Sequence, residues 1–201
     1  PGSFVGPHDV LAWLNGRRDE KTVARARSAF TIAKDRSFDQ DPRFGLIVLT
    51  EIASRALSPG INDPGTAIDV IGRAVRALAL WVEGPEEPDS EPPFPNVYVP
   101  SLTIADLFDD VFTPIARDGA GNIGVQVRLM KALATLATFR HEGLPAAVTH
   151  HVRLGLKRAE NAMALEEDLD RLDEVARVVT ERLELAATSG RHPGWLEAGH
   201  P

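Results

Sequence analysis

A nine-residue segment rich in proline and glycine, residues 58–66, separates two apolar stretches of the chain. Pro59 cannot continue a helix, and it disfavours helical geometry in the residue before it. Asp63 suits the N-cap of a following helix, and Pro64 suits that helix's first position. The segment therefore predicts a tight corner between two helices, over residues 44–57 and 64–82.

The two flanking stretches have the periodicity of packed helices. Residues 44–57 carry a broad apolar face, and residues 64–82 are apolar nearly all round except for one polar stripe, which is typical of a central helix. We therefore expect the two to form a central helical hairpin. Charged side chains of both helices could meet in a partly buried structural network. These side chains are Glu51, Arg55, Asp69, Arg73 and Arg76.

The rest of the chain favours a mainly α fold of about six helices. Leucine, alanine and valine recur from Leu165 to Leu183 at alternating spacings of four and three residues. In so short a run this heptad pattern favours packing inside the molecule over a long coiled coil. Short apolar segments predict a small β element, formed by the N-terminal strands at residues 3–5, 10–14 and 30–32 together with residues 97–99.

We expect residues 1–201 to form one soluble domain. We also expect this chain to be a fragment of a longer protein. Residues 1–35 form a small N-terminal part and residues 36–82 the core hairpin. Residues 83–95 hold five prolines and five acidic residues, which predicts an acidic surface loop. A helical part over residues 96–190 and a tail over residues 191–201 complete the chain.

Composition excludes several function classes. The net charge of −7 argues against nonspecific binding to nucleic acid, which requires a basic surface. The absence of cysteine excludes disulfides, thiolate metal sites and cysteine nucleophiles. The most apolar stretch, residues 66–82, is interrupted by charged residues and too short to span a bilayer. We also find no phosphate-binding glycine loop, dinucleotide fingerprint or serine-hydrolase motif.

The first candidate site is the polar turn from Arg36 to Pro42. Asp39 and Asp41 lie two positions apart, so their carboxylates could share a hard cation or act as an acid–base pair. A simpler interpretation is that one of them caps the helix that begins near Pro42. Gln40 lies between them.

The second candidate site is the corner at residues 58–66. Glycine at position 65 disfavours the first helical turn by about 1 kcal/mol relative to alanine, which suggests close approach by a ligand. The N–H groups of a helix start favour anions, and Arg55 could hold a carboxylate or phosphate. Asp63 would compete with such an anion, and a small cation held by Asp63 and Asn62 is an alternative. A rigid, capped corner is the structural interpretation.

Two function classes follow from these sites. The leading hypothesis is a non-enzymatic binding domain. Under this hypothesis the second corner, residues 58–66, is the favoured candidate site. The alternative is a metal-dependent or acid–base hydrolase that uses Asp39, Asp41 and Asp63 with Arg55, although the first two lie one helix length from the third. No catalytic residue, metal or cofactor is assigned. The candidate binding residues are Arg36, Asp39, Gln40, Asp41, Arg55, Ser58, Asn62, Asp63 and Thr66.

These motifs resemble those of a family of predicted bacterial multi-pass membrane proteins of unknown function. The resemblance covers about residues 36–80, with residues 55–67, Arg-Ala-Leu-Ser-Pro-Gly-Ile-Asn-Asp-Pro-Gly-Thr-Ala, as its signature. The opening Pro-Gly-Ser-Phe-Val resembles a family stretch in which an acidic residue stands where this chain has Ser3.

The resemblance implies that this chain is the soluble C-terminal region of an integral membrane protein, and it implies no activity. We expect the domain to sense a ligand or to support assembly. Its expected partners are the transmembrane part of the same protein, another copy of the chain, and a small ion or anion.

Overall fold

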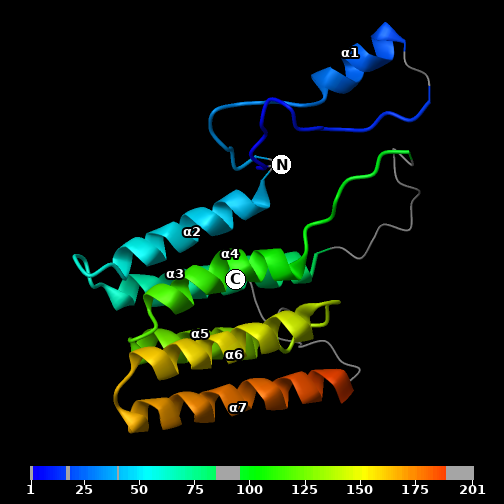
Figure 1. Ribbon diagram of the computed structural model, residues 1–201. Coiled ribbons are helices and arrows are strands. Elements are labelled where there is room, and N and C mark those ends of the chain that lie inside the picture. The colour runs from blue at the N-terminus through cyan, green and yellow to red at the C-terminus, as the bar shows by residue number, and fades with distance from the viewer. Residues whose placement is uncertain (1, 17–18, 40, 85–95, 189–201) are drawn as a thin grey trace, which may run out of the picture. The chain divides into compact units, whose positions relative to one another are not determined.

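The computed structural model describes residues 2–16, 19–39, 41–84 and 96–188 (Figure 1). The chain divides into two compact units, residues 1–45 and residues 46–201. The described residues form seven helices rather than about six, and they contain no strand. Of the predicted segments, Gln40, most of the acidic loop and the tail lie outside the described residues.

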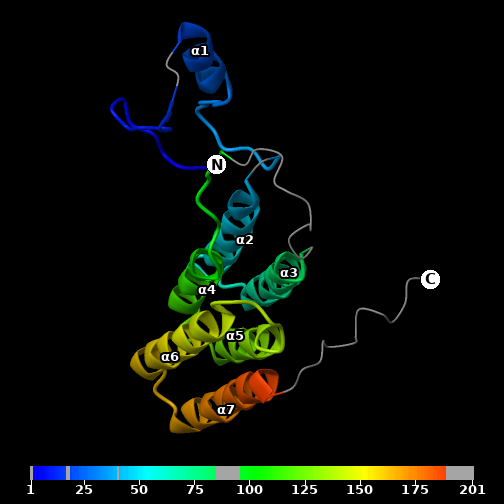
Figure 2. The same cartoon turned by 90° about the vertical axis from the view of Figure 1, so that its right-hand side faces the viewer.

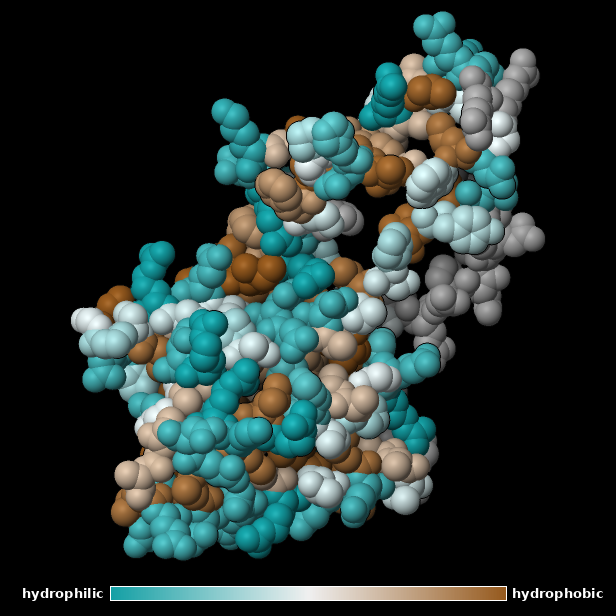
Figure 3. All heavy atoms as spheres, in the orientation of Figure 1, coloured by the Kyte–Doolittle hydropathy of each residue, from teal (hydrophilic) through white to brown (hydrophobic). Residues whose placement is uncertain are grey.

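The N-terminal unit holds helix α1, Glu20–Ser28, and the first turn of helix α2, Pro42–Ala56. Asp19 caps α1 by accepting a hydrogen bond from the Thr22 N–H (2.8 Å), yet α1 buries no residue. Hydrophobic side chains lie at the surface of this unit (Figure 3), and Phe4 and Trp13 are 97% and 88% exposed. The apolar segments therefore lack a core to cover them.

The prediction of a small β element is wrong for the described residues. Residues 3–5, 10–14, 30–32 and 97–99 are all irregular, and their apolar side chains are largely exposed. Strand propensity measures how well a side chain packs on neighbouring strands. Without paired partners, a short apolar segment has no ladder of hydrogen bonds to join, so its composition alone does not make a strand.

The second unit is a bundle of helices centred on α5, Ile123–Leu136. Helix α5 packs against α3, α4, α6 and α7 (Figure 2), and its apolar residues are buried on most sides. The centre therefore falls on α5 and not on the predicted hairpin. The surrounding helices are α3, Pro64–Val82; α4, Ile104–Asp118; α6, Leu144–Ala162; and α7, Glu166–Thr188.

Two helices show how packing overrides or confirms sequence patterns. Helix α4 continues through Pro114 to Asp118, although a proline inside a helix usually kinks or breaks it. Buried Phe112 and Ile115 flank the proline and fix this segment in the core. On α7, the heptad positions Leu172 and Val179 are buried, and α7 packs most extensively on α5, as expected for a stripe that packs inside the molecule.

Candidate functional site

The corner between α2 and α3 is closed by backbone hydrogen bonds. The Ser58 carbonyl accepts bonds from the N–H groups of Ile61 (3.0 Å) and Asn62 (2.9 Å). The Asp63 N–H donates to the Ala56 carbonyl at 2.8 Å. These bonds satisfy carbonyls that the end of a helix would otherwise leave without partners. The predicted tight corner is therefore present, with α2 ending at Ala56 and α3 beginning at Pro64.

Asn62 has a backbone role in this corner. Its φ is +49°, in the left-handed region, where asparagine is tolerated better than most residues. This conformation turns the chain from Ile61 into Asp63. The asparagine that the sequence suggests as a ligand therefore has a conformational explanation.

Substitution of Asn62 tests this role. We expect Asn62→Ala to lower the free energy of unfolding by about 1 kcal/mol, because a Cβ without a compensating polar group is disfavoured at positive φ. Asn62→Gly should be neutral or slightly stabilising. Urea titration of both variants measures the difference. Equal destabilisation by the two substitutions would show that the side chain, and not the backbone conformation, is what matters.

Asp63 caps α3 as predicted. Its Oδ1 accepts a hydrogen bond from the Thr66 N–H (3.1 Å), and its Oδ2 accepts one from the Thr66 hydroxyl (2.6 Å). The Thr66 hydroxyl, followed by the Thr66 N–H, lowers the pKa of the Asp63 carboxyl, which is therefore ionised at neutral pH. A Cβ on Gly65 would lie 3.3 Å from Asp63 Oδ1, so glycine leaves room for the capping carboxylate.

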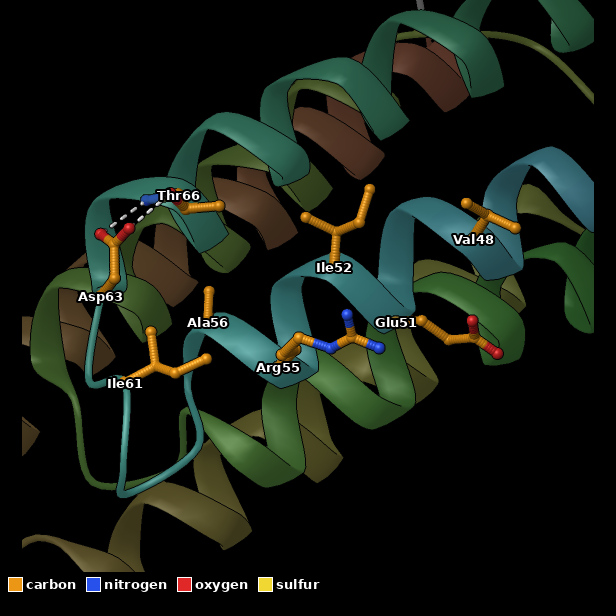
Figure 4. A pocket seen from close by; sticks show the side chains of 8 residues that line it. All are labelled: Val48, Glu51, Ile52, Arg55, Ala56, Ile61, Asp63 and Thr66. Atoms are coloured by element: carbon orange, nitrogen blue, oxygen red, sulfur yellow. Dashed lines mark hydrogen bonds between the residues drawn. The ribbon is translucent and has the colours of Figure 1, made fainter.

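An open hollow of about 410 Å³ lies beside this corner (Figure 4). Ile52 and Ile61 remain 46% and 53% exposed in it. Arg55 is exposed as well, and its guanidinium has no hydrogen bond or ion pair with any described residue. The hollow thus combines apolar surface with a guanidinium that has no partner among the residues that the structure describes. Its lining residues are Val48, Glu51, Ile52, Arg55, Ala56, Ile61, Asp63 and Thr66.

Helix α2 supplies one face of this hollow. Val48, Glu51, Ile52 and Arg55 follow the spacing i, i+3, i+4 and i+7, which places them on one stripe of the helix. We call these four residues the outer stripe. The opposite side of α2 is buried, at Leu46, Thr50, Ala53 and Ala56. Helix α2 is therefore amphipathic, but its outer stripe carries two apolar side chains, Ile52, which is exposed, and Val48, which is half-buried.

A second hollow, of about 470 Å³, lies between α2 and α4. Its lining includes Glu51, which lines the first hollow too, and Asp109, Asp110 and Arg117 of α4. Glu51 thus stands on a ridge of α2 between the two depressions. Glu51 is therefore the residue of the outer stripe that lines both hollows.

The first candidate site is built differently. The Arg36 guanidinium pairs with Asp41 Oδ2 (Nη2 at 2.6 Å, Nε at 2.8 Å) and lies 5.1 Å from the centre of the Phe44 ring. Asp41 Oδ1 accepts a bond from the Phe44 N–H, so Asp41 caps α2 as the simpler interpretation predicts. A Cβ at position 2 would clash with this ion pair, so the glycine at this position leaves room for it. Asp39 is exposed, whereas Asp41 is held by Arg36 and by the Phe44 N–H.

The structure gives no support to the hydrolase alternative. Asp41 is 5% exposed and occupied by Arg36, while Asp63 is occupied by Thr66. The described residues contain no group of three or more histidine, aspartate or glutamate side chains that could hold a metal ion. The start of α3 is also unsuited to an anion, because the Asp63 carboxylate already accepts from its N–H groups.

The expected network of buried charges is absent from the described hairpin. Arg73 pairs with Asp69 within α3 at 2.8 Å, and both side chains are more than half exposed. Sequence reasoning also missed Val48, Ile52 and Ile61 as surface residues of the site. The i, i+3, i+4, i+7 spacing could have indicated a separate stripe, but a sequence does not show which of two apolar faces is covered.

Comparison with known proteins supports the membrane interpretation in outline. The described residues are helical throughout their regular parts, and none of the described helices has the length and apolar character needed to cross a bilayer. The chain belongs to a family described as predicted membrane proteins (DUF2254), whose family model matches residues 1–135.

Uncharacterized mycobacterial proteins are among the relatives of this chain. One protein of Mycobacterium bovis and two of Mycobacterium tuberculosis strains are each 55% identical to it over 76 residues. The matched segment is 35% of this chain and 15% of each relative, so the chain corresponds to a small part of those proteins. No solved structure matches the chain.

Proposed function

We propose that this chain is a non-enzymatic helical domain of a membrane protein, and that it supports assembly through the α2–α3 corner. The observation that carries the proposal is the outer stripe of α2, with Ile52 half exposed beside the exposed Ile61. Full burial of an isoleucine side chain contributes about 1.5–3 kcal/mol, so a partner that covers both gains binding free energy. The Arg55 guanidinium, which no described residue pairs with, supplies specificity.

The shape and charge of the hollow favour a macromolecular partner over a small anion. Small-molecule sites are concave and enclose most of their ligand, whereas this hollow is open to solvent. Two carboxylates, Glu51 and Asp63, line it with the single guanidinium of Arg55. An isolated anion would meet net negative charge there. A protein surface that brings a carboxylate to Arg55 and a cation to Glu51 satisfies both of these charges.

The membrane connection explains why such a surface is useful. Family membership associates the chain with membrane proteins, and the described helices do not themselves cross a bilayer. A helical domain attached to a membrane-embedded part is held at high local concentration near its partners. A modest surface such as the outer stripe is then sufficient for assembly.

Photo-crosslinking in the intact membrane protein tests this proposal. We expect a photoreactive amino acid at position 52 or 61 to give a protein crosslink in native membranes, because a partner covers the corner. The matched control is position 178 on α7, where Val178 is 38% exposed on another surface, and we expect no crosslink there. Equal labelling at all three positions, or none at any of them, would contradict the proposal.

A further inference from the structure

The geometry points to a second copy of this chain as the occupant of the corner, with the α2 helices of the two copies packed antiparallel about a two-fold axis. This inference rests on the proposed function and names its partner. An isologous interface uses the same patch on both subunits, so each residue must meet its complement in the other copy. The outer stripe satisfies that requirement.

Charge complementarity is the first reason. Glu51 and Arg55 lie one helical turn apart on the same stripe and carry opposite charges. In an antiparallel pair centred between them, Arg55 of each copy faces Glu51 of the other. The two ion pairs are then formed at once by a single symmetric contact. A parallel arrangement would place like charges opposite each other, which is unfavourable.

Apolar complementarity follows from the same axis. With the axis at position 53, Ile52 of each copy lies about 1.5 Å from it along the helix, so the two isoleucines pack together. Val48 then lies opposite position 58 of the other copy, where the corner begins and Ile61 is 53% exposed. The apolar side chains of the hollow therefore meet one another, with the ion pairs beside them.

The small size of the stripe sets the expected affinity. Stable complexes bury about 1,200–2,000 Å² in total, and four residues on one helix with one corner residue provide less. The net charge of −7 on each copy adds long-range repulsion, which salt reduces. We therefore expect a dissociation constant of about 10 μM to 1 mM at physiological ionic strength, strengthened when the chains are held in a membrane.

A charge-swap experiment tests the inference on the 201-residue chain. Sedimentation equilibrium should show a monomer–dimer system. Glu51→Arg and Arg55→Glu should each weaken it by about tenfold or more, because each places like charges opposite each other. The double variant Glu51→Arg with Arg55→Glu should recover dimerisation, since the pairs re-form with reversed signs. Circular dichroism verifies that the variants fold.

A cysteine variant gives an independent readout. The chain has no cysteine, so Ile52→Cys introduces a single thiol close to the proposed axis. We expect a short bis-maleimide to link two copies through position 52, and not through position 178 in Val178→Cys.

The outcomes separate this inference from the proposed function. A chain that stays monomeric at millimolar concentration, or a double variant as weak as the single ones, would overturn the second copy as partner. If crosslinks at positions 52 and 61 in membranes then capture a different protein, the proposed assembly function stands without self-association. If those positions capture nothing, both fail.

Discussion

Replacing Gln126 with glutamate is expected to lower the free energy of unfolding by about 3–5 kcal/mol, the largest effect of any substitution proposed for this chain. Gln126 is fully buried on α5, and its Nε2 donates to the carbonyls of Ala116 (3.1 Å) and Gly119 (3.0 Å) at the end of α4. Gln126→Glu removes both donors and places a buried carboxylate against two carbonyl oxygens. Urea denaturation followed by circular dichroism measures the loss.

A second substitution at the same site separates charge from packing. Gln126→Met keeps the length of the side chain and also removes the Oε1 acceptor, which has no hydrogen-bond partner in the described part of the chain. It removes the amide donor from the Ala116 carbonyl, while the Gly119 carbonyl keeps its bond from the Asn122 N–H (3.0 Å). We expect a loss of about 1–3 kcal/mol. Gln126→Met should therefore lower the free energy of unfolding by less than Gln126→Glu does. The opposite order, or a glutamate variant as stable as the original chain, would contradict this view of the α4–α5 junction.

Acid is expected to destabilise the fold through His151, by about 2–3 kcal/mol between pH 6.5 and pH 4. The His151 side chain is 3% exposed beside Phe108 and Phe112, and its Nε2 lies 3.4 Å from Asp109 Oδ1. Burial lowers the pKa of His151 to about 4, although the Asp109 carboxylate partly opposes that shift. In this pH window the unfolded chain binds the proton and the folded chain does not. Stability is therefore complete above pH 6.5 and is lost as the pH falls.

Two histidine variants isolate this contribution. His151→Phe should flatten the dependence of stability on pH between 4 and 6.5, because no imidazole remains to be protonated. His150→Gln is the matched control, since His150 is exposed and adjacent, and it should keep most of the slope. Thermal melts across this pH range measure both. A steep slope that survives His151→Phe would assign the acid sensitivity to another group.

Local signals made the corner between α2 and α3 predictable. The Asp63 cap, the proline that follows it and the end of α2 before Pro59 depend on residues within about one helical turn. Asp41 as the cap of α2 is predictable for the same reason. Features of this kind require no knowledge of the rest of the chain.

Features that depend on distant parts of the chain could not be predicted. Gln126 reaches carbonyls ten and seven residues away, and His151 meets α4 from α6. The strand segments failed because pairing partners decide whether a strand forms. Pro114 is accommodated inside α4 in a well-packed part of the core. In each case tertiary packing prevails over local propensity.

The sequence and the structure point to overlapping residues at the corner, but they give those residues different roles. The sequence pointed to Arg55 and to the polar residues of the corner, Asn62, Asp63 and Thr66. The structure gives those polar residues roles in the backbone turn and the cap, and leaves Arg55 as the polar group without a partner among the described residues. The apolar part of the surface, Ile52 in particular, emerges only when the buried face of α2 is known.

We propose that a protein partner covers the outer stripe of α2 in the intact membrane protein. The most direct measurement is photo-crosslinking from position 52 in native membranes, compared with position 178 on α7. We predict a defined crosslinked product from position 52, its loss on the additional substitution Arg55→Glu, and no product from position 178. The proposal would be contradicted if position 52 gave no crosslinked product. It would also be contradicted if the yield of that product did not change on Arg55→Glu.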